Sequence, residues 1–319
     1  MNTSALERVC RKVVGECTGL HSGEVCLLVK DLETSALHRA FESAILACGG
    51  VPLVLNLPEE AYVRGPLPKG VELIMTSADV VLLCTRQLFP HAPRRAATQA
   101  GARLLSLGTV TEEMALRALD VDYDELSRVT RGVADAITKA SEVLITSQAG
   151  TEIRMSIADQ PVTYLDGLAR EAGKSSALPA GVVATLPVPG SAEGKVVLNG
   201  SIVSIGLLEK PIILTVERGR VTDIQGEEEA ERLLEILEAA DENAWCVAEV
   251  GLGTNPRAIY TGNVVEDERV RGSGHIGLGG NVRLGGTIES SLHLDATIRK
   301  PSIYLDGQVI VRDGTLLES

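Results

Sequence analysis

The segment between residues 249 and 295 guides the prediction of both the fold and the site. It contains Glu-Val-Gly-Leu-Gly-Thr-Asn-Pro at 249–256, Gly-Ser-Gly-His-Ile-Gly-Leu-Gly at 272–279 and Ser-Leu-His-Leu-Asp at 291–295. Glycines flank His275, so the backbone there can approach another group closely. His293 and Asp295 are two residues apart, and on a β-strand their side chains point to the same face. Two imidazoles and a carboxylate are a minimal set for a divalent transition metal, and Glu249 is a further candidate.

Several roles in this segment stay open. Either histidine alone is better explained as a hydrogen-bonded residue of a β domain, and only the His-x-Asp pair together with Glu249 favours a metal. Glu249 is a metal ligand, a carboxylate that orients a histidine, or a catalytic base. Arg271 and Arg283 are candidates to bind a substrate carboxylate or phenolate, or are surface salt-bridge partners. Asn255 is a candidate substrate contact or a turn residue.

Composition narrows the class of protein. A chain of 319 residues favours two domains, and 45% hydrophobic with only 3% aromatic residues predicts an aliphatic core. The net charge of −13 argues against a nucleic-acid partner, which needs a basic patch. No apolar run reaches the roughly 20 residues of a membrane span, and the N-terminus lacks the pattern of a signal peptide. The six scattered cysteines are typical of a reducing compartment, so we expect a cytoplasmic protein.

The first 140 residues alternate between helical and strand patterns. We expect helices at 6–20, 33–48, 92–100, 112–119 and 123–140, and strands at 24–29, 51–57, 78–85 and 102–108. The run Val80-Val81-Leu82-Leu83-Cys84 is nearly continuous in apolar residues, which suits a parallel strand covered on both faces. Strands separated by helices of this length predict βαβ units and an N-terminal α/β domain over residues 1–140. No Gly-x-Gly-x-x-Gly follows a strand, so no dinucleotide site is indicated.

From residue 141 the pattern becomes rich in strands. We expect a hairpin at 142–148 and 152–157, one helix at 227–240, and strands at 196–198, 202–205, 212–217, 221–224, 245–250, 302–305 and 308–311. A stretch rich in Gly, Ala, Ser and Pro covers 173–190. Residues 141–319 therefore predict a β-rich α+β domain that carries the whole candidate metal site.

These residues also resemble a known superfamily. The phrases are Ala-Gly-Thr-Glu at 149–152, Leu-Pro-Ala-Gly at 178–181, Ala-Glu-Gly at 192–194, the glycine-rich phrases at 248–256 and 274–279, and His-Leu-Asp at 293–295. Together they resemble the aminopeptidase T metallopeptidases and the related dihydroxypyridine dioxygenases. The resemblance implies an α/β domain, a β-rich metal domain, a homodimer, and metal ligands at Glu249, His275, His293 and Asp295.

Two positions depart from the peptidase pattern. The peptidases carry a metal-binding glutamate where this chain has Val182, and a tyrosine where it has Val282. The remaining ligands suit one metal better than two, and two histidines with one carboxylate are typical of non-haem Fe(II) oxygenases. The same ligands also suit a single hydrolytic Zn²⁺, and ligand count does not separate the two metals.

Three functions stay open from the sequence. The leading interpretation is a mononuclear metal enzyme with one divalent ion per chain, Fe(II) favoured over zinc, cobalt or manganese, acting on a small hydroxylated ring or related acid. The second is a metallo-aminopeptidase that releases N-terminal residues from short peptides. The third is a catalytically lapsed binding protein of the same fold. Few aromatic residues are present to seal the glycine-rich site, so a homodimer is expected, with the metal cleft facing the junction of the two domains or the partner chain. The alternative is a monomer whose own N-terminal domain covers the site.

Overall fold

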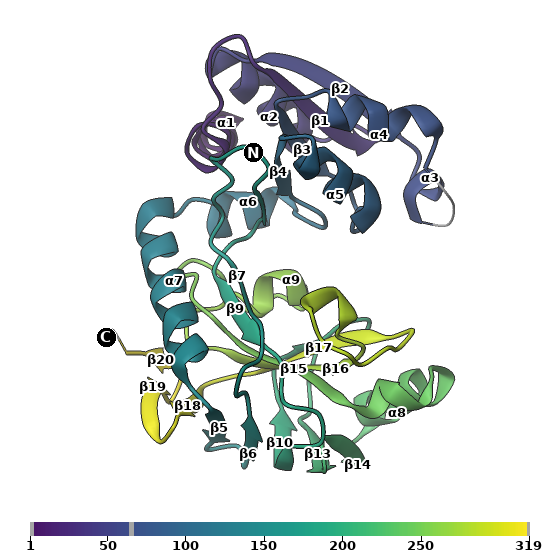
Figure 1. Ribbon diagram of the computed structural model, residues 1–319, viewed down its shortest axis with the longest axis vertical. Coiled ribbons are helices and arrows are strands. Elements are labelled where there is room, and N and C mark those ends of the chain that lie inside the picture. Colours follow the sequence, from purple (N-terminus) through teal and green to yellow (C-terminus); the bar gives the residue numbers. More distant parts are fainter. Residues whose placement is uncertain (1–2, 64–66, 318–319) are drawn as a thin grey trace. The chain divides into compact units, whose positions relative to one another are not determined.

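The computed structural model describes residues 3–63 and 67–317, and the chain divides into two compact units. Unit 1 comprises Met1–Ser127 and Leu165–Ala180, and unit 2 comprises Arg128–Tyr164 and Gly181–Ser319. The chain therefore passes between the units three times, first within helix α7 (Tyr123–Lys139). The mixed architecture expected from the sequence, a parallel α/β part and a β-rich part, is confirmed (Figure 1).

Unit 1 is built on a parallel sheet. Its strand order is β2-β1-β3-β4-β8, and every neighbouring pair runs parallel. The strands are β1 (Val25–Asp31), β2 (Val51–Leu57), β3 (Val80–Cys84), β4 (Arg103–Ser106) and β8 (Ser175–Ala177). β3 is buried along its whole length, as its apolar run predicts. β8 was not predicted, because its three residues lie in the stretch rich in small residues and have no apolar pattern.

Helices connect these strands. They are α1 (Thr3–Lys12), α2 (Ala36–Ala47), α3 (Glu60–Val63), α4 (Lys69–Thr76), α5 (His91–Gln99), α6 (Glu112–Ala118) and the start of α7. The single helix expected at 6–20 is divided in two. Its first part is α1, and a π-helix at Val13–Cys17 follows directly. Two β-branched valines followed by Gly15 have low helix propensity, which explains the change of geometry.

Unit 2 contains two sheets, mainly antiparallel. The order of the larger sheet is β14-β13-β10-β6-β5-β18-β19-β20, and that of the smaller is β12-β11-β17-β16-β15-β9-β7. The larger sheet comprises β5 (Glu142–Ser147), β6 (Glu152–Ser156), β10 (Glu193–Leu198), β13 (Ile212–Glu217), β14 (Arg220–Gln225), β18 (Pro301–Leu305), β19 (Gln308–Arg312) and β20 (Thr315–Leu316). The smaller comprises β7 (Val162–Leu165), β9 (Val182–Thr185), β11 (Ser201–Ile202), β12 (Gly206–Leu207), β15 (Val247–Gly253), β16 (Gly274–Gly279) and β17 (His293–Ile298).

One aliphatic core joins these sheets. Ile145 and Leu214 of the larger sheet and Ile276 and Leu294 of the smaller belong to the same buried cluster. α7 and α8 (Glu228–Ala239) contribute further buried residues, while α9 (Val264–Asp267) and the 3₁₀ turns Glu242–Trp245 and Val282–Leu284 lie in connections. The predicted hairpin and the single long helix of this half are confirmed. Strands β7, β9 and β16 were not assigned in advance, because glycine or short length hides their alternation, and β17 was considered as a strand only at His293 and Asp295.

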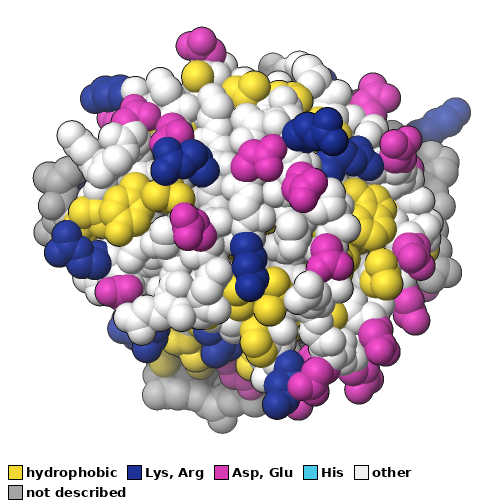
Figure 2. Space-filling model, turned by 90° about the horizontal axis from the view of Figure 1, so that it is seen from below, with side chains coloured by type: hydrophobic (Ala, Val, Ile, Leu, Met, Phe, Trp, Pro, Cys, Tyr) yellow, Lys and Arg dark blue, Asp and Glu magenta, His cyan; other side chains and the backbone are white. Residues whose placement is uncertain are grey.

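The surface is mixed in charge. Figure 2 shows Lys and Arg side chains interspersed with Asp and Glu on one face of the molecule, in keeping with the net charge of −13. Among the described residues, no helix has both the length and the apolar character needed to cross a bilayer.

Candidate metal centre

Three neighbouring strands of unit 2 build the candidate site. β16 lies between β15 and β17 and is antiparallel to both (Figure 1). In this register Gly277 lies opposite Glu249 on one side and opposite Asp295 on the other. His293 enters from the start of β17, two residues before Asp295, so both side chains lie on the same face of the strand.

The structure brings three of the four expected ligands into one group. One ligand atom each from Glu249, His293 and Asp295 lies within 4.8 Å of the other two. The Nε2 atom of His293 is 3.3 Å from Oε2 of Glu249 and 3.3 Å from Oδ1 of Asp295. One imidazole nitrogen and two carboxylate oxygens therefore converge on a single point, where one cation would contact all three.

A glycine makes room for this group. A Cβ atom on Gly277 would lie 2.8 Å from Cβ of Glu249, 3.1 Å from Oδ1 of Asp295 and 3.2 Å from Cε1 of His293. Any side chain at this position would therefore press on all three residues at once. The glycines around His275 were expected to allow close approach of the backbone, but the place of Gly277 beneath all three ligands was not predicted.

His293 is held with one nitrogen directed at the carboxylates. Its Nδ1 lies 2.7 Å from the carbonyl oxygen of Gly280, which fixes the proton on Nδ1 and leaves Nε2 for the cluster. Burial opposes a charge on this ring, yet hydrogen bonds and charge from Asp295 and Glu249 raise its pKa to about 11. The two carboxylates thus strongly favour a positive charge at this point.

His275 lies beside the group, in contact with Glu249. Its side chain is buried, and its Nε2 atom is 3.4 Å from Oε1 of Glu249. The ring occupies space that only a glycine at residue 251 leaves, since a Cβ there would lie 2.4 Å from Cε1 of His275. Burial opposes ionisation of Glu249, but hydrogen bonds with His275 and His293 hold its pKa below the usual value. Glu249 therefore shares one carboxylate oxygen with each histidine.

The donor set fits a metal ion. Within the described ranges, Oδ1 of Asp295 is buried and has no hydrogen-bond partner of good geometry, although Nε2 of His293 is 3.3 Å away. A buried carboxylate oxygen without such a partner is costly unless a cation satisfies it. Together with the space above Gly277, this oxygen supports a divalent ion bound by Glu249, His293 and Asp295.

A buried arginine also belongs to the site and was missed from the sequence. The Arg269 side chain is 6% exposed and pairs with Glu268. Burial lowers the pKa of its guanidinium to about 10, while the charges of Asp295 and Glu249 act in the opposite direction. It still carries a positive charge at neutral pH and offsets part of the negative charge of the cluster. The acidic run 266–268 has the composition of a solvated loop, so the burial of the adjacent Arg269 was not predicted.

The three expected substrate contacts lie in different settings. Asn255 is fully buried, and its Oδ1 accepts hydrogen bonds from the backbone N–H groups of Arg257 and Ala258 at 2.8 and 3.2 Å, as a turn residue does. The backbone N–H of Arg271 donates to the carbonyl of Asn255. Arg283 is exposed in the 3₁₀ turn Val282–Leu284.

Comparison with known proteins identifies the family. The family profile described as 2,5-dihydroxypyridine 5,6-dioxygenase matches residues 5–318. The chain belongs to this family. A 2,5-dihydroxypyridine 5,6-dioxygenase of Pseudomonas putida is 27% identical over 284 residues, which are 85% of this chain and 76% of that protein. The superfamily inferred from the motifs is therefore confirmed, and the chain is an enzyme of the metal-dependent class.

Two solved structures share the fold of this chain. The structure of 2,5-dihydroxypyridine dioxygenase from Pseudomonas putida has a TM-score of 0.85 at 21% identity and covers 100% of this chain and 99% of its own. AmpT from Thermus thermophilus has a TM-score of 0.68 at 17% identity, with 99% of both chains covered. At the two positions that depart from the peptidase pattern, Val182 is buried in β9 and Val282 is 52% exposed. Neither side chain has an atom that binds a metal or donates a proton.

Proposed function

We propose that this protein is a mononuclear, metal-dependent dioxygenase of a small hydroxylated ring, 2,5-dihydroxypyridine or a related acid. The observation that carries the proposal is the convergence of Glu249, His293 and Asp295 on one point in a member of the dioxygenase family. One imidazole and two carboxylates supply nitrogen and oxygen donors to one divalent ion. Fe(II) is favoured because the chain belongs to a dioxygenase family, with zinc, cobalt and manganese as alternatives that the same donor types also suit.

The residues have distinct tasks in this proposal. Bound Fe(II) would supply the redox centre at which dioxygen reacts with a dihydroxylated ring. His293 presents Nε2 because Gly280 holds its Nδ1 proton. Glu249 directs its Oε2 atom toward the cluster and its Oε1 atom toward His275. The pair formed by Glu249 and His275 therefore holds a proton beside the ligands and is the proposed base. The ligand role expected of His275 itself stays a prediction.

Substrate contacts and assembly complete the proposal. Arg283 is exposed and lies in a 3₁₀ turn, outside the β-strands, which supports a role in binding a substrate anion. For Arg271 and Asn255 the substrate role stays a prediction. The side chain of His293 is 35% exposed, so a second subunit or the substrate must exclude water during catalysis. We therefore retain a homodimer, in a cytoplasm that keeps the six free cysteines reduced.

Metal content and turnover test this function together. Protein purified without added metal should contain close to one iron per chain, and the anaerobically Fe(II)-loaded enzyme should consume O₂ with 2,5-dihydroxypyridine. His293→Ala should lose both iron and turnover. His21→Ala, which removes an exposed histidine of unit 1, should keep both. An iron-free protein that stays inactive after loading would support a lapsed binding protein instead.

The aminopeptidase alternative rests on the fold shared with AmpT. Two-metal hydrolysis needs a further carboxylate, which Val182 does not supply, and Val282 cannot replace a tyrosine hydroxyl. We therefore expect negligible hydrolysis of leucyl reporter substrates with excess cobalt or zinc. Metal-stimulated hydrolysis that disappears in His293→Ala would establish the peptidase instead.

A further inference from the structure

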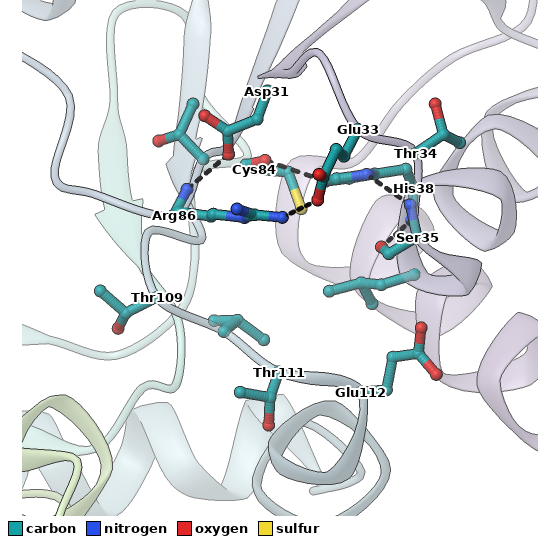
Figure 3. A pocket seen from close by; sticks show the side chains of 13 residues that line it. Asp31, Glu33, Thr34, Ser35, His38, Cys84, Arg86, Thr109, Thr111 and Glu112 are labelled. Carbon is teal, nitrogen blue, oxygen red and sulfur yellow. Dashed lines mark hydrogen bonds and ion pairs between the residues drawn. The ribbon is translucent and has the colours of Figure 1, made fainter. Parts of the chain in front are cut away.

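A cavity of about 360 Å³ opens in unit 1, at the carboxyl ends of β1, β3 and β4 (Figure 3). Three segments line it: residues 31–38 from the end of β1 to the start of α2, 84–86 at the end of β3, and 109–112 between β4 and the start of α6. β1 and β3 are neighbours, yet β1 leads to β2 on one side while β3 leads to β4 on the other. Open α/β sheets bind ligands at this kind of switch point. None of the lining residues belongs to the metal centre.

One side of the cavity carries a guanidinium group. The backbone N–H of Arg86 donates to Oδ2 of Asp31 at 2.7 Å, which fixes the start of the loop. The Arg86 side chain pairs with Glu33, and these side chains are 61% and 78% exposed. Exposed ion pairs contribute little to stability. The guanidinium can therefore exchange Glu33 for another carboxylate at little cost.

The other side carries a carboxylate and hydroxyl groups. Figure 3 shows Thr111 and Glu112 across the cavity from Arg86 and Glu33. Oε1 of Glu112 accepts a hydrogen bond from the backbone N–H of Ala36 at 3.0 Å, which holds the side chain and leaves Oε2 to bind a donor. The Thr111 hydroxyl accepts from the N–H of Met114 and keeps its own proton to donate.

The charges select the class of ligand. Asp31 is already satisfied, because Oδ1 accepts from the Tyr62 hydroxyl at 2.6 Å and Oδ2 from Arg86. The charged groups left to bind a ligand are then one guanidinium and the carboxylates of Glu33 and Glu112, and Asp31 adds a further negative charge to the lining. A phosphate or dicarboxylate would meet these carboxylates as like charges, whereas a simple amine would bind Glu112 alone and leave Arg86 in its exposed pair with Glu33. A zwitterion complements both sides.

We propose that this cavity binds a small zwitterion of the α-amino-acid class. The ligand carboxylate binds Arg86, its ammonium binds Glu112, and its side chain packs against Leu37 and Val110. The volume of about 360 Å³ is at the lower end of the range for small-molecule pockets, which fits a metabolite of this size. This second site is independent of the chemistry proposed for the metal centre.

Isothermal titration calorimetry with the free amino acids tests the proposal. At least one should bind saturably, and its N-acetyl and amide derivatives, which each lack one charge, should bind at least about tenfold more weakly. Failure of every free amino acid to bind would overturn the proposal. Equal binding of the amide or of the N-acetyl derivative would overturn the zwitterion requirement.

Matched variants locate the site. Arg86→Gln and Glu112→Gln should each weaken binding at least about tenfold, and the amide oxygen introduced by Glu112→Gln still accepts the hydrogen bond from Ala36. Arg154→Gln removes an equally exposed arginine, 59% against 61%, from a salt bridge in unit 2 and should leave binding unchanged. His293→Ala should also bind normally. Loss of binding in His293→Ala would place the ligand at the metal centre and overturn an independent site.

Discussion

Replacing Gly277 by alanine should empty the metal centre while the β-rich unit stays folded. The added Cβ would lie 2.8 Å from Cβ of Glu249 and 3.1 Å from Oδ1 of Asp295, so both carboxylates must move by several tenths of an ångström. Metal sites tolerate only about 0.2 Å in ligand distances. We expect metal affinity to fall by about 100-fold, and overpacking to cost about 1–3 kcal/mol of unfolding free energy.

Gly274 provides a matched control in the same strand. A Cβ there would be 3.3 Å from Pro301 and 3.7 Å from Ile303, so Gly274→Ala should keep its metal affinity. The assay is competition for Fe(II) or Co(II) with a chelator of known affinity, with thermal unfolding of the metal-free proteins recorded in parallel. Each kcal/mol should lower Tm by about 2–4 °C for a unit of this size. Unchanged metal affinity in Gly277→Ala would refute the reasoning.

Three further perturbations address the surroundings of the site. His275→Ala should weaken metal binding about 10–100-fold if the ring only orients Glu249, and chelator competition should show a larger loss if it is itself a ligand. Arg269→Met should cost about 3–5 kcal/mol in urea unfolding, because Glu268 loses its buried partner; a change below about 1 kcal/mol would contradict that pairing. Hydrogen bonds from the Ser291 amide and hydroxyl lower the pKa of Asp241 to about 2, so its stabilising effect is present above about pH 4 and is lost as pH falls through 2. Asp241→Asn should therefore have a lower Tm than the native chain at pH 7, and this difference in Tm should disappear between about pH 4 and 2. A difference in Tm that stays constant with pH would exclude this linkage.

The elements of the parallel α/β part could be predicted from the sequence, because apolar runs and helical spacings are local signals. β3 matches its predicted strand within two residues at either end, and α7 ends within one. The small-residue stretch at 173–190 gave no such signal. β8 forms there because the exposed edge of β4 accepts it as a parallel neighbour, a long-range pairing that periodicity does not encode. The glycine-rich strand β16 was hidden for the related reason that it carries few side chains to alternate.

The site was readable where chemistry follows from spacing. The His-x-Asp pair predicts two ligands on one face, and the motif order pointed to Glu249. The contribution of Gly277 was not readable, because it depends on the register of three strands separated by up to 46 residues. The burial of Arg269 was hidden in the same way, since its neighbours Asp267 and Glu268 have the composition of a surface loop.

The chain passes between the two units three times, and this limits how the protein can fold during synthesis and how it can be cut into fragments that fold. A ribosome completes β4 long before residues 175–177, which pair with the free edge of that strand. Until then the growing chain carries a parallel sheet with a bare edge, although every residue of β4 is buried in the finished protein. A fragment ending at residue 140 would keep that edge permanently and is expected to aggregate. Independent expression of the first unit therefore requires residues 165–180, joined to it by a short linker in place of residues 128–164.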